Sequence, residues 1–284
     1  MTEQITRLPN LAILQVTGQD AANFLQGQVT CDVRLVTTDN ASLGALCNPK
    51  GRVISNFIIG KVAAGFVLLL PVALADLVLQ RLQRYILRAD VNIERPAGLV
   101  CLGCLVPAAQ PKPDHHEGAL WPWASLPAVS GYQRWLSVVP EQTSPPEDTR
   151  WLAAWHYHDI RWGWLWLSEA TSESFIPQTL RLDTLGAVAF DKGCYTGQEI
   201  VARTHYLGKA KRMLCCATVG QTHAVAINAA VVDHAQQTVG QVLDNVEFDG
   251  QRYLTVLLSA EHPAEAYLFT EAPDASLLHL ETYP

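Results

Sequence analysis

The 284-residue chain is short of basic residues and of long apolar runs. Lysine and arginine together number 20, against 27 aspartates and glutamates, so the formal net charge is −7 at pH 7. This balance argues against a generally basic nucleic-acid-binding protein, because neutralising phosphates requires clustered lysines and arginines. The most apolar run, residues 62–75, contains Gly65 and Pro71 and is too short to span a membrane. Any contact with RNA must therefore be local.

The chain also lacks a signal peptide and a disulfide framework. Its first residues contain neither the basic region nor the apolar core of a secretion signal. Seven cysteines, an odd number without framework spacing, predict reduced thiols and a cytoplasmic protein. Cys101 and Cys104 form a C-x-x-C pair, but they lie in an apolar run of strand length and predict a buried strand rather than a metal site.

No metal site is expected elsewhere in the chain. His115 and His116 lie between two acidic residues, but consecutive residues in a loop rarely converge on one ion, so a surface loop is expected. Cys215 and Cys216 stand at the start of an apolar segment. Adjacent side chains on a strand face opposite ways, which disfavours a shared metal.

The hydrophobic pattern predicts an α+β protein in three parts. With 49% hydrophobic and 17% charged residues, a chain of this length can form two or three small domains. Strand and helix patterns mix in residues 1–107, which include a helical pattern over residues 72–88, and mix again in residues 108–208. Residues 209–284 carry strand patterns, some of them around the Asp249-Gly250 turn, and predict a C-terminal antiparallel β-barrel.

One stretch, residues 191–203, carries the pattern most suited to chemistry. Thr196 and Glu199 have capping-box spacing, which predicts an N-cap at Thr196 and a short helix from Gln198 to Thr204. Cys194 then lies just before a helix start, where free N–H groups and the helix dipole favour an anion, and Lys192 adds a positive charge. Both effects favour thiolate over thiol, so Cys194 and Lys192 are the candidate catalytic residues.

Gly193 and Gly197 bracket this cysteine and predict a need for backbone freedom or close approach. The alternative is a buried structural cysteine in a glycine-containing turn, since free cysteines are usually buried and inert. The basic, polar, helix-capping surroundings favour the reactive thiol. A cysteine hydrolase is a further alternative with His205 as its base, although no orienting carboxylate is evident.

The sequence K-G-C-Y-T-G-Q-E, followed by I-V-A-R, resembles the signature of the YgfZ family, folate-binding proteins related in fold to the aminomethyltransferase (T protein) of the glycine cleavage system. Residues 26–33, 47–52 and 175–178 resemble further family motifs, so the likeness covers roughly three quarters of the chain. It implies two interlocked α/β segments followed by a β-barrel. It also implies a cytoplasmic factor that binds tetrahydrofolate or a related folate and supports iron-sulfur enzymes and tRNA modification through Cys194. The remaining motif residues would hold the cysteine loop or contact a partner: Gly193, Tyr195, Gly197, Gln198, Glu199 and Arg203.

The resemblance also predicts which residues would bind folate. A pterin needs an aromatic or apolar wall and directed polar groups. The family's folate-contacting tryptophan maps onto Trp155, which could equally fill a core. Arg161 stands where relatives carry a glutamate and cannot accept the same hydrogen bonds, and Leu11 replaces a second family tryptophan.

The chain lacks the aspartate that the T protein uses for catalysis, and this bears on whether the protein is an enzyme. The T protein uses an aspartate where this chain has Ser55 and Asn56, neither of which titrates near neutral pH, so aminomethyl transfer is not expected. Two other functions stay open at this point. One is a folate-dependent one-carbon transferase with an unusual site. The other is a scaffold that contacts RNA or a protein partner through a basic stretch consisting of Arg203, Lys209, Lys211 and Arg212.

Overall fold

The computed structural model describes residues 4–114, 116–208, 211–220, 225–259, 266–268, 276–281 and 283. These residues form two compact units, which interleave along the sequence. Unit 1 comprises Met1–Leu152, Trp166–Gln178 and Leu182–Leu207, and unit 2 comprises Ala153–Leu165, Thr179–Arg181 and Gly208–Pro284. The three-part division at residues 107 and 208 stays a prediction.

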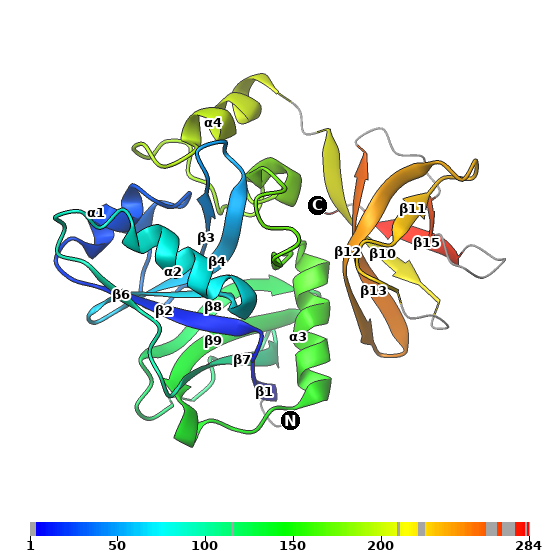
Figure 1. The fold of residues 1–284 in the computed structure, drawn as a ribbon. Helices are drawn as coiled ribbons and strands as arrows, with labels where there is room; N and C mark the ends of the chain where they lie inside the picture. The colour runs from blue at the N-terminus through cyan, green and yellow to red at the C-terminus, as the bar shows by residue number, and fades with distance from the viewer. Residues whose placement is uncertain are drawn as a thin grey trace. The chain divides into compact units, whose positions relative to one another are not determined.

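The first sheet of unit 1 is five-stranded and antiparallel (Figure 1). Its spatial order is β3 (Ser42–Cys47), β4 (Val53–Val62), β5 (Gly65–Pro71), β2 (Leu11–Thr17) and β6 (Asn92–Glu94). Two short helices, α1 (Ala21–Gln26) and α2 (Ala75–Gln83), bury Phe24, Leu25, Val78 and Leu82 in the same core as these strands. This arrangement places both helices and the β3–β4 turn around one core.

Helix α2 is shorter than the helical pattern over residues 72–88 predicts. Residues Val72–Leu74 form a 3₁₀ turn, η2, and α2 ends at Gln83. Beyond it, the amides of Tyr85 and Ile86 bond to the carbonyls of Leu82 and Gln83, three residues back. The chain therefore tightens into a 3₁₀-type turn, and the apolar spacing continues without the α-helical bonding.

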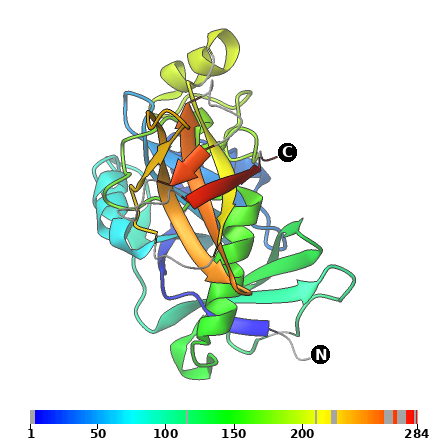
Figure 2. The ribbon, with the colours of Figure 1, turned by 90° about the vertical axis from the view of Figure 1, so that its right-hand side faces the viewer.

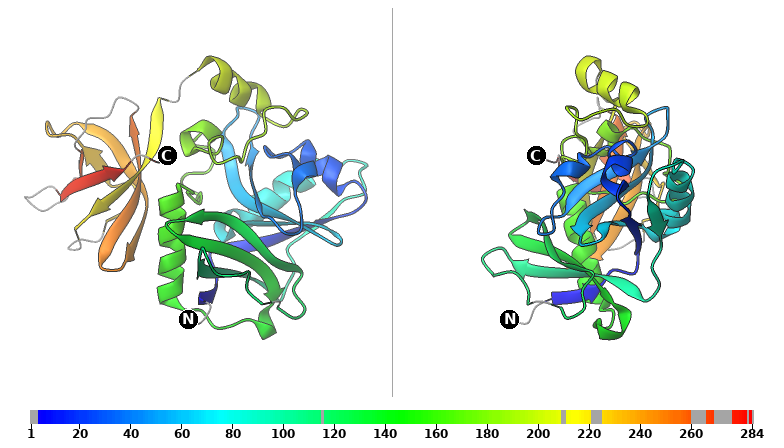
Figure 3. Two further views of the ribbon diagram at one scale, coloured as in Figure 1. Left: turned by 180° about the vertical axis from the view of Figure 1, so that it is seen from behind. Right: turned by 90° about the vertical axis from the view of Figure 1, so that its left-hand side faces the viewer.

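The second sheet of unit 1 has four strands, seen from behind in Figure 3. Its order is β1 (Gln4–Arg7), β7 (Leu99–Pro107), β9 (Tyr132–Pro140) and β8 (Trp121–Val129). Cys101 and Cys104 both lie buried in β7, which confirms the expected buried strand. The N-terminal strand β1 pairs with β7 rather than with its neighbour β2, a long-range pairing that local patterns do not reveal.

Unit 2 contains an antiparallel sheet that curls strongly (Figure 2). Strands β10 (Arg212–Val219), β13 (Gln251–Ser259) and β12 (Thr238–Phe248) pair over eight residues each. The others are β11 (Ala230–Val232), β14 (Ala266–Leu268) and β15 (Ser276–Glu281), and the pairings that complete the ring extend over only two or three residues. The predicted antiparallel strands are present, but the sheet is better described as a curled half-barrel than as an evenly paired barrel.

Helix α3 (Thr149–Trp162) begins directly after residues 146–148, whose Pro-Glu-Asp sequence predicts a helix start. The Asp148 carboxylate accepts hydrogen bonds from the backbone amides of Arg150 (2.9 Å) and Trp151 (3.2 Å), which is N-capping. The helix ends before Gly163, whose φ of +83° is the left-handed conformation common after a helix. The remaining elements are the 3₁₀ turns η1 (Val33–Leu35), η3 (Glu141–Thr143) and η4 (Pro177–Leu180) and the helix α4 (Gln198–Leu207).

Within the described residues, no helix combines the length and the apolar character that a membrane crossing requires.

Candidate functional site

The loop before α4 presents one exposed thiol between two buried side chains. Cys194 is exposed, whereas the other six cysteines of the chain are buried. Lys192 and Tyr195, on either side, are each only 6% exposed. The loop is therefore anchored in the core of unit 1 while the Cys194 side chain reaches solvent. This excludes the alternative of a buried structural cysteine at position 194.

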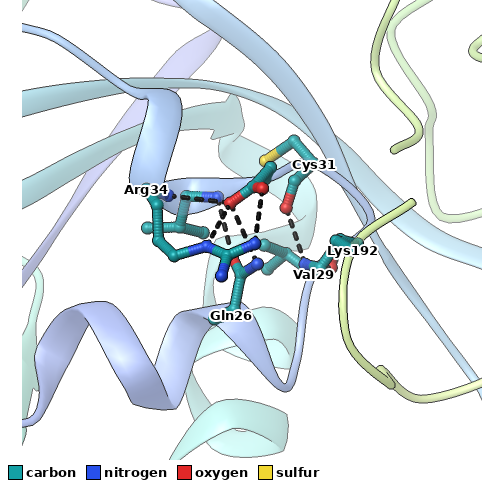
Figure 4. A network of polar contacts seen from close by, with 7 residues as sticks. Gln26, Val29, Cys31, Arg34 and Lys192 are labelled. Atoms are coloured by element: carbon teal, nitrogen blue, oxygen red, sulfur yellow. Dashed lines mark hydrogen bonds and ion pairs between the residues drawn. The ribbon is translucent and has the colours of Figure 1, made fainter. Parts of the chain in front are cut away.

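Lys192 attaches the loop to the stretch that follows α1. Its Nζ donates hydrogen bonds to the carbonyls of Val29 and Cys31, both at 2.7 Å (Figure 4). Burial lowers the pKa of Lys192 to about 8, against the opposing influence of nearby acidic groups. The ammonium is thus directed at two backbone acceptors, a structural role beyond the positive charge for which the sequence singles it out.

A polar network shapes the stretch that Lys192 contacts (Figure 4). The Asp32 carboxylate accepts two hydrogen bonds from the Arg34 guanidinium, Nε–Oδ1 at 3.0 Å and Nη2–Oδ2 at 2.8 Å, one from the Arg34 backbone amide at 3.1 Å and one from Gln26 Nε2 at 2.9 Å. These hydrogen bonds, those from Arg34 above all, hold the pKa of Asp32 well below its usual range. Gln26 also accepts from the backbone amide of Val33 (2.8 Å). The residues of this first family-like motif therefore act on local structure.

The two glycines around Cys194 differ in what the fold requires of them. Gly197 has a φ of +84°, and a Cβ atom there would lie 2.4 Å from the carbonyl oxygen of Asn48. The same Cβ would lie 2.9 Å from Cα of Gly51, and a Cβ added at Gly51 would itself lie 2.9 Å from Cβ of Ile200. The prediction for Gly197 is confirmed. For Gly193 it is wrong, because its φ is not left-handed and an added Cβ would meet nothing within 4 Å.

Asn48 organises the turn against which Gly197 packs. Its Oδ1 accepts hydrogen bonds from the amides of Lys50 (2.9 Å) and Arg52 (3.0 Å), and its Nδ2 donates to Glu173 Oε2 (2.8 Å). The Asn-Pro-Lys-Gly composition predicts the turn, and an asparagine that bonds the backbone two residues on is the expected signal for it. The structure adds the contact with the cysteine loop, which joins two motifs far apart in sequence.

Helix α4 begins at Gln198 as predicted and extends three residues beyond Thr204. Gly197, not Thr196, immediately precedes the first helical residue, so the predicted N-cap at Thr196 is wrong by one position. Val201 is the buried residue of the helix, and Gln178 Nε2 donates to its carbonyl (2.8 Å). The helix is thus held along one side and through the side chain of a residue that precedes it by twenty positions.

The opposite side of α4 is open to solvent. The exposed residues of the helix are Glu199, Ile200, Arg203, His205, Tyr206 and Leu207. Although exposed, the His205 ring stacks on Phe190, with centroids 3.8 Å apart and an interplanar angle of 17°. His205 therefore has a packing contact of its own, which argues against a role as the base of a cysteine hydrolase.

The folate-site candidates lie on α3 and are engaged within unit 2. Trp155 is 4% exposed, so little of its indole is available as a wall. Arg161 forms an ion pair with Glu281, and its Nη1 donates to Cys216 Sγ at 3.8 Å. As they stand in this unit, the two side chains do not fit a pterin, which needs an accessible ring face and free hydrogen-bonding groups.

The positions that replace the transferase aspartate are structural. Ser55 and Asn56 are fully buried. The Ser55 hydroxyl donates to the carbonyl of Asn56 (3.0 Å), and Asn56 Oδ1 accepts from the amide of Leu167 (3.2 Å). Leu11, at the second tryptophan position, is also buried.

The residues of the basic stretch are divided between the two units. Arg203 is exposed in unit 1, whereas Lys211 and Arg212 are exposed in unit 2. Lys209 lies outside the described residues, as does His115. In the part of the chain that is described, no group of three or more histidine, cysteine or acidic side chains is placed to hold a metal ion. Cys215 and Cys216 belong to different core clusters, which confirms that they face opposite ways.

No family model matches the chain, but known proteins are similar to it over most of its length. The tRNA-modifying protein YgfZ of Vibrio vulnificus (strain CMCP6) is 32% identical over 87% of this chain and 81% of its own length. The tRNA-modifying protein YgfZ of Escherichia coli O17:K52:H18 (strain UMN026 / ExPEC) is 28% identical over 98% and 91%, respectively.

Among solved structures, the glycine cleavage system aminomethyltransferase T from Bartonella henselae matches with a TM-score of 0.73. The match covers 99% of this chain and 84% of that one at 14% identity, so it shows a shared mixed α+β, aminomethyltransferase-like fold and no more. The 32% identity to the Vibrio vulnificus protein over most of both chains shows that this chain belongs to the YgfZ family.

Proposed function

We propose that this protein supports iron-sulfur enzymes and tRNA modification through the thiol of Cys194. The observation that carries the proposal is the anchored loop, which exposes Cys194 while Lys192 and Tyr195 are buried on both sides of it. The relatives are named as tRNA-modifying proteins, which supports the choice of process. A soft thiolate is a natural ligand for iron or a nucleophile for sulfur chemistry.

The rigidity of the loop serves this role. A side chain that must meet a partner's reactive group benefits from being held in place before the encounter. Lys192 fixes the loop on one side of Cys194 through the carbonyls of Val29 and Cys31, and Gly197 fixes it on the other through the Asn48 turn. Gln198 and Glu199 begin helix α4, and Arg203 lies on its exposed side; these three are the residues proposed to contact the partner.

Folate, as tetrahydrofolate or a related form, is the ligand proposed from the family and the fold. When bound, it would supply a one-carbon carrier. Trp155 and Arg161 are engaged within unit 2, so no step is assigned to them. A titration of the purified protein with tetrahydrofolate tests binding directly. No saturable heat from a folded protein would remove folate from the proposal without affecting the role of Cys194.

The test of the thiol is complementation in cells that lack the protein. The Cys194→Ala variant should fold normally and fail to restore the activity of an iron-sulfur tRNA-modifying enzyme. Gly193→Ala is the matched control, because an added methyl group there meets open space. It should restore activity fully. Restoration by Cys194→Ala at normal protein levels would overturn the proposal.

A folate-dependent one-carbon transferase is the second candidate. The fold similarity to an aminomethyltransferase favours it, whereas the buried, uncharged Ser55 and Asn56 oppose it. Folate-dependent turnover of an aminomethyl or methyl donor by the purified protein would establish it. The scaffold alternative predicts that reversing the charge of Arg203 and Lys211 weakens partner binding.

A further inference from the structure

A small pocket in unit 1 brings the end of α2 beside two motif loops. Its lining includes Arg81 and Tyr85 from α2 and the turn after it, Asn48 and Pro49 from the β3–β4 turn, and Thr196 from the cysteine loop. Gln28 also lines it, and the Oε1 atom of that side chain is buried without a hydrogen-bond partner. A buried acceptor without a partner is costly, and it marks a place where a ligand's donor would be stabilised.

Several basic residues lie next to the pocket-lining residues in the sequence, in a chain whose net charge is −7. Arg84 and Arg88 follow Arg81 at spacings of three and four residues, and both are exposed. Lys50 and Arg52 are exposed on the β3–β4 turn. The turn and α2 meet at one point, since Arg52 Nη1 donates to the carbonyl of Ser174 and Arg81 Nη2 lies 3.3 Å from Glu173 Oε1.

Few negative charges offset this concentration. Glu173 is the carboxylate that pairs with Arg81, and it also accepts from Asn48. Among the ion pairs of the described residues, none involves Arg84, Arg88, Lys50 or Arg52. The guanidinium groups of Arg84 and Arg88 are therefore available to an anion from solution.

An exposed aromatic ring in the pocket lining points to the kind of anion. Tyr85 is 47% exposed and stands between Arg84 and Arg88 in sequence while lining the pocket. Arginine forks match phosphate oxygens, and an exposed aromatic ring among them is the arrangement that binds single-stranded nucleic acid by stacking bases.

We propose that this arginine–tyrosine surface, formed by Lys50, Arg52, Arg81, Arg84, Tyr85 and Arg88 around Gln28, binds a single-stranded segment of RNA. The arginines neutralise phosphates, Tyr85 stacks on one base, and Gln28 Oε1 accepts from a base amino group. The choice of RNA over DNA rests on the proposed role in tRNA modification. The surface differs from the basic stretch that begins at Arg203, and no residue of it needs the Cys194 thiol.

Fluorescence anisotropy with a labelled 12-nucleotide RNA tests the surface. The double variant Arg84→Glu/Arg88→Glu should bind at least about tenfold more weakly and lower the salt slope by about 0.7 for each phosphate that it no longer neutralises. Tyr85→Ala should weaken binding about fivefold or more with an unchanged salt slope, and Tyr85→Phe should retain it. The control Lys112→Glu/Arg150→Glu changes the net charge equally at exposed positions that do not line the pocket. Its affinity should change little.

Three outcomes would overturn the proposal. They are no binding by the folded protein, equal weakening by the control pair, and equal affinity for DNA of the same sequence, which would remove the assignment to RNA. Oligo(U) lacks exocyclic amino groups, so Gln28→Leu should lower affinity for oligo(A) and not for oligo(U); unchanged affinity for both would exclude the Gln28 contact. Cys194→Ala should bind RNA normally, so failure of the thiol proposal and failure of this one are distinguishable.

Discussion

The sequence predicts functional residues in two places, the loop around Cys194 in unit 1 and the part of α3 in unit 2 that contains Trp155 and Arg161. The accessibility of these residues differs between the two places. Around Cys194 the side chains of Lys192 and Tyr195 are buried, whereas the Cys194 thiol is exposed. On α3 the two residues predicted to bind folate already have other contacts. Trp155 is buried, and Arg161 forms an ion pair with Glu281. A residue type suited to chemistry therefore becomes a site only where the surrounding packing leaves it accessible.

The largest expected difference between the two places is in the stability cost of removing Trp155 or Cys194. Trp155→Ala should lower the free energy of unfolding by about 3–5 kcal/mol, because a buried indole leaves a large cavity. Cys194→Ala should change it by less than about 0.5 kcal/mol, as expected of an exposed side chain. Urea unfolding of both variants measures the difference. Similar stabilities would show that Trp155 is not a core residue.

Within the cysteine loop, Gly193 and Gly197 should differ in how much an alanine substitution lowers stability. Gly197→Ala should cost about 2–3 kcal/mol, since it combines a left-handed φ with a collision against the carbonyl of Asn48. Gly193→Ala should cost less than about 0.5 kcal/mol, because the added methyl group enters open space. Thermal and urea unfolding of the two variants would measure this difference in stability. Equal losses would mean that the loop is not held at Gly197.

Replacing Lys192 tests whether its side-chain nitrogen anchors the loop. Lys192→Met should cost about 1–3 kcal/mol, because the carbonyls of Val29 and Cys31 lose their donor. Since the folded-state pKa is lowered to about 8 from 10.5, the unfolded chain binds more protons between these values, and this group's contribution to stability rises with pH there. The stability gap between the wild type and Lys192→Met should thus widen from pH 8 to 10.5. A constant gap in urea unfolding would contradict the assignment.

The smallest expected effect concerns a pair in unit 2 that sequence patterns do not reveal. His156 Nε2 lies 2.8 Å from Asp244 Oδ2. Burial alone would lower the pKa of His156, but the hydrogen bond and charge of Asp244 outweigh it and the pKa is raised. The pair's contribution is therefore full below pH 6.5 and is lost as the pH rises through the raised value. Asp244→Asn should remove up to about 1 kcal/mol at pH 5.5 and less at pH 9.

Local patterns predict several elements of this fold well. The cap at Asp148, the apolar run with Cys101 and Cys104, and the Asn-Pro-Lys-Gly turn each act within a few residues, and each appears where the sequence places it. The 72–88 pattern is less reliable, because apolar spacing does not distinguish an α-helix from the 3₁₀ turns on either side of α2. The pairing of β1 with β7 depends on contacts about a hundred residues apart and leaves no local trace.

By itself, the sequence determined the family, the helix that begins at Gln198 and the presence of one thiol in a polar, glycine-bracketed stretch. These properties reside in residue identity and short-range spacing. Only the tertiary structure decided that Cys194 is exposed, that Gly197 packs on the turn of Asn48 while Gly193 touches nothing, and that Lys192 bonds two carbonyls far away in sequence. Exposure and close approach depend on which distant segments pack together, and residue spacing along the chain does not encode that directly.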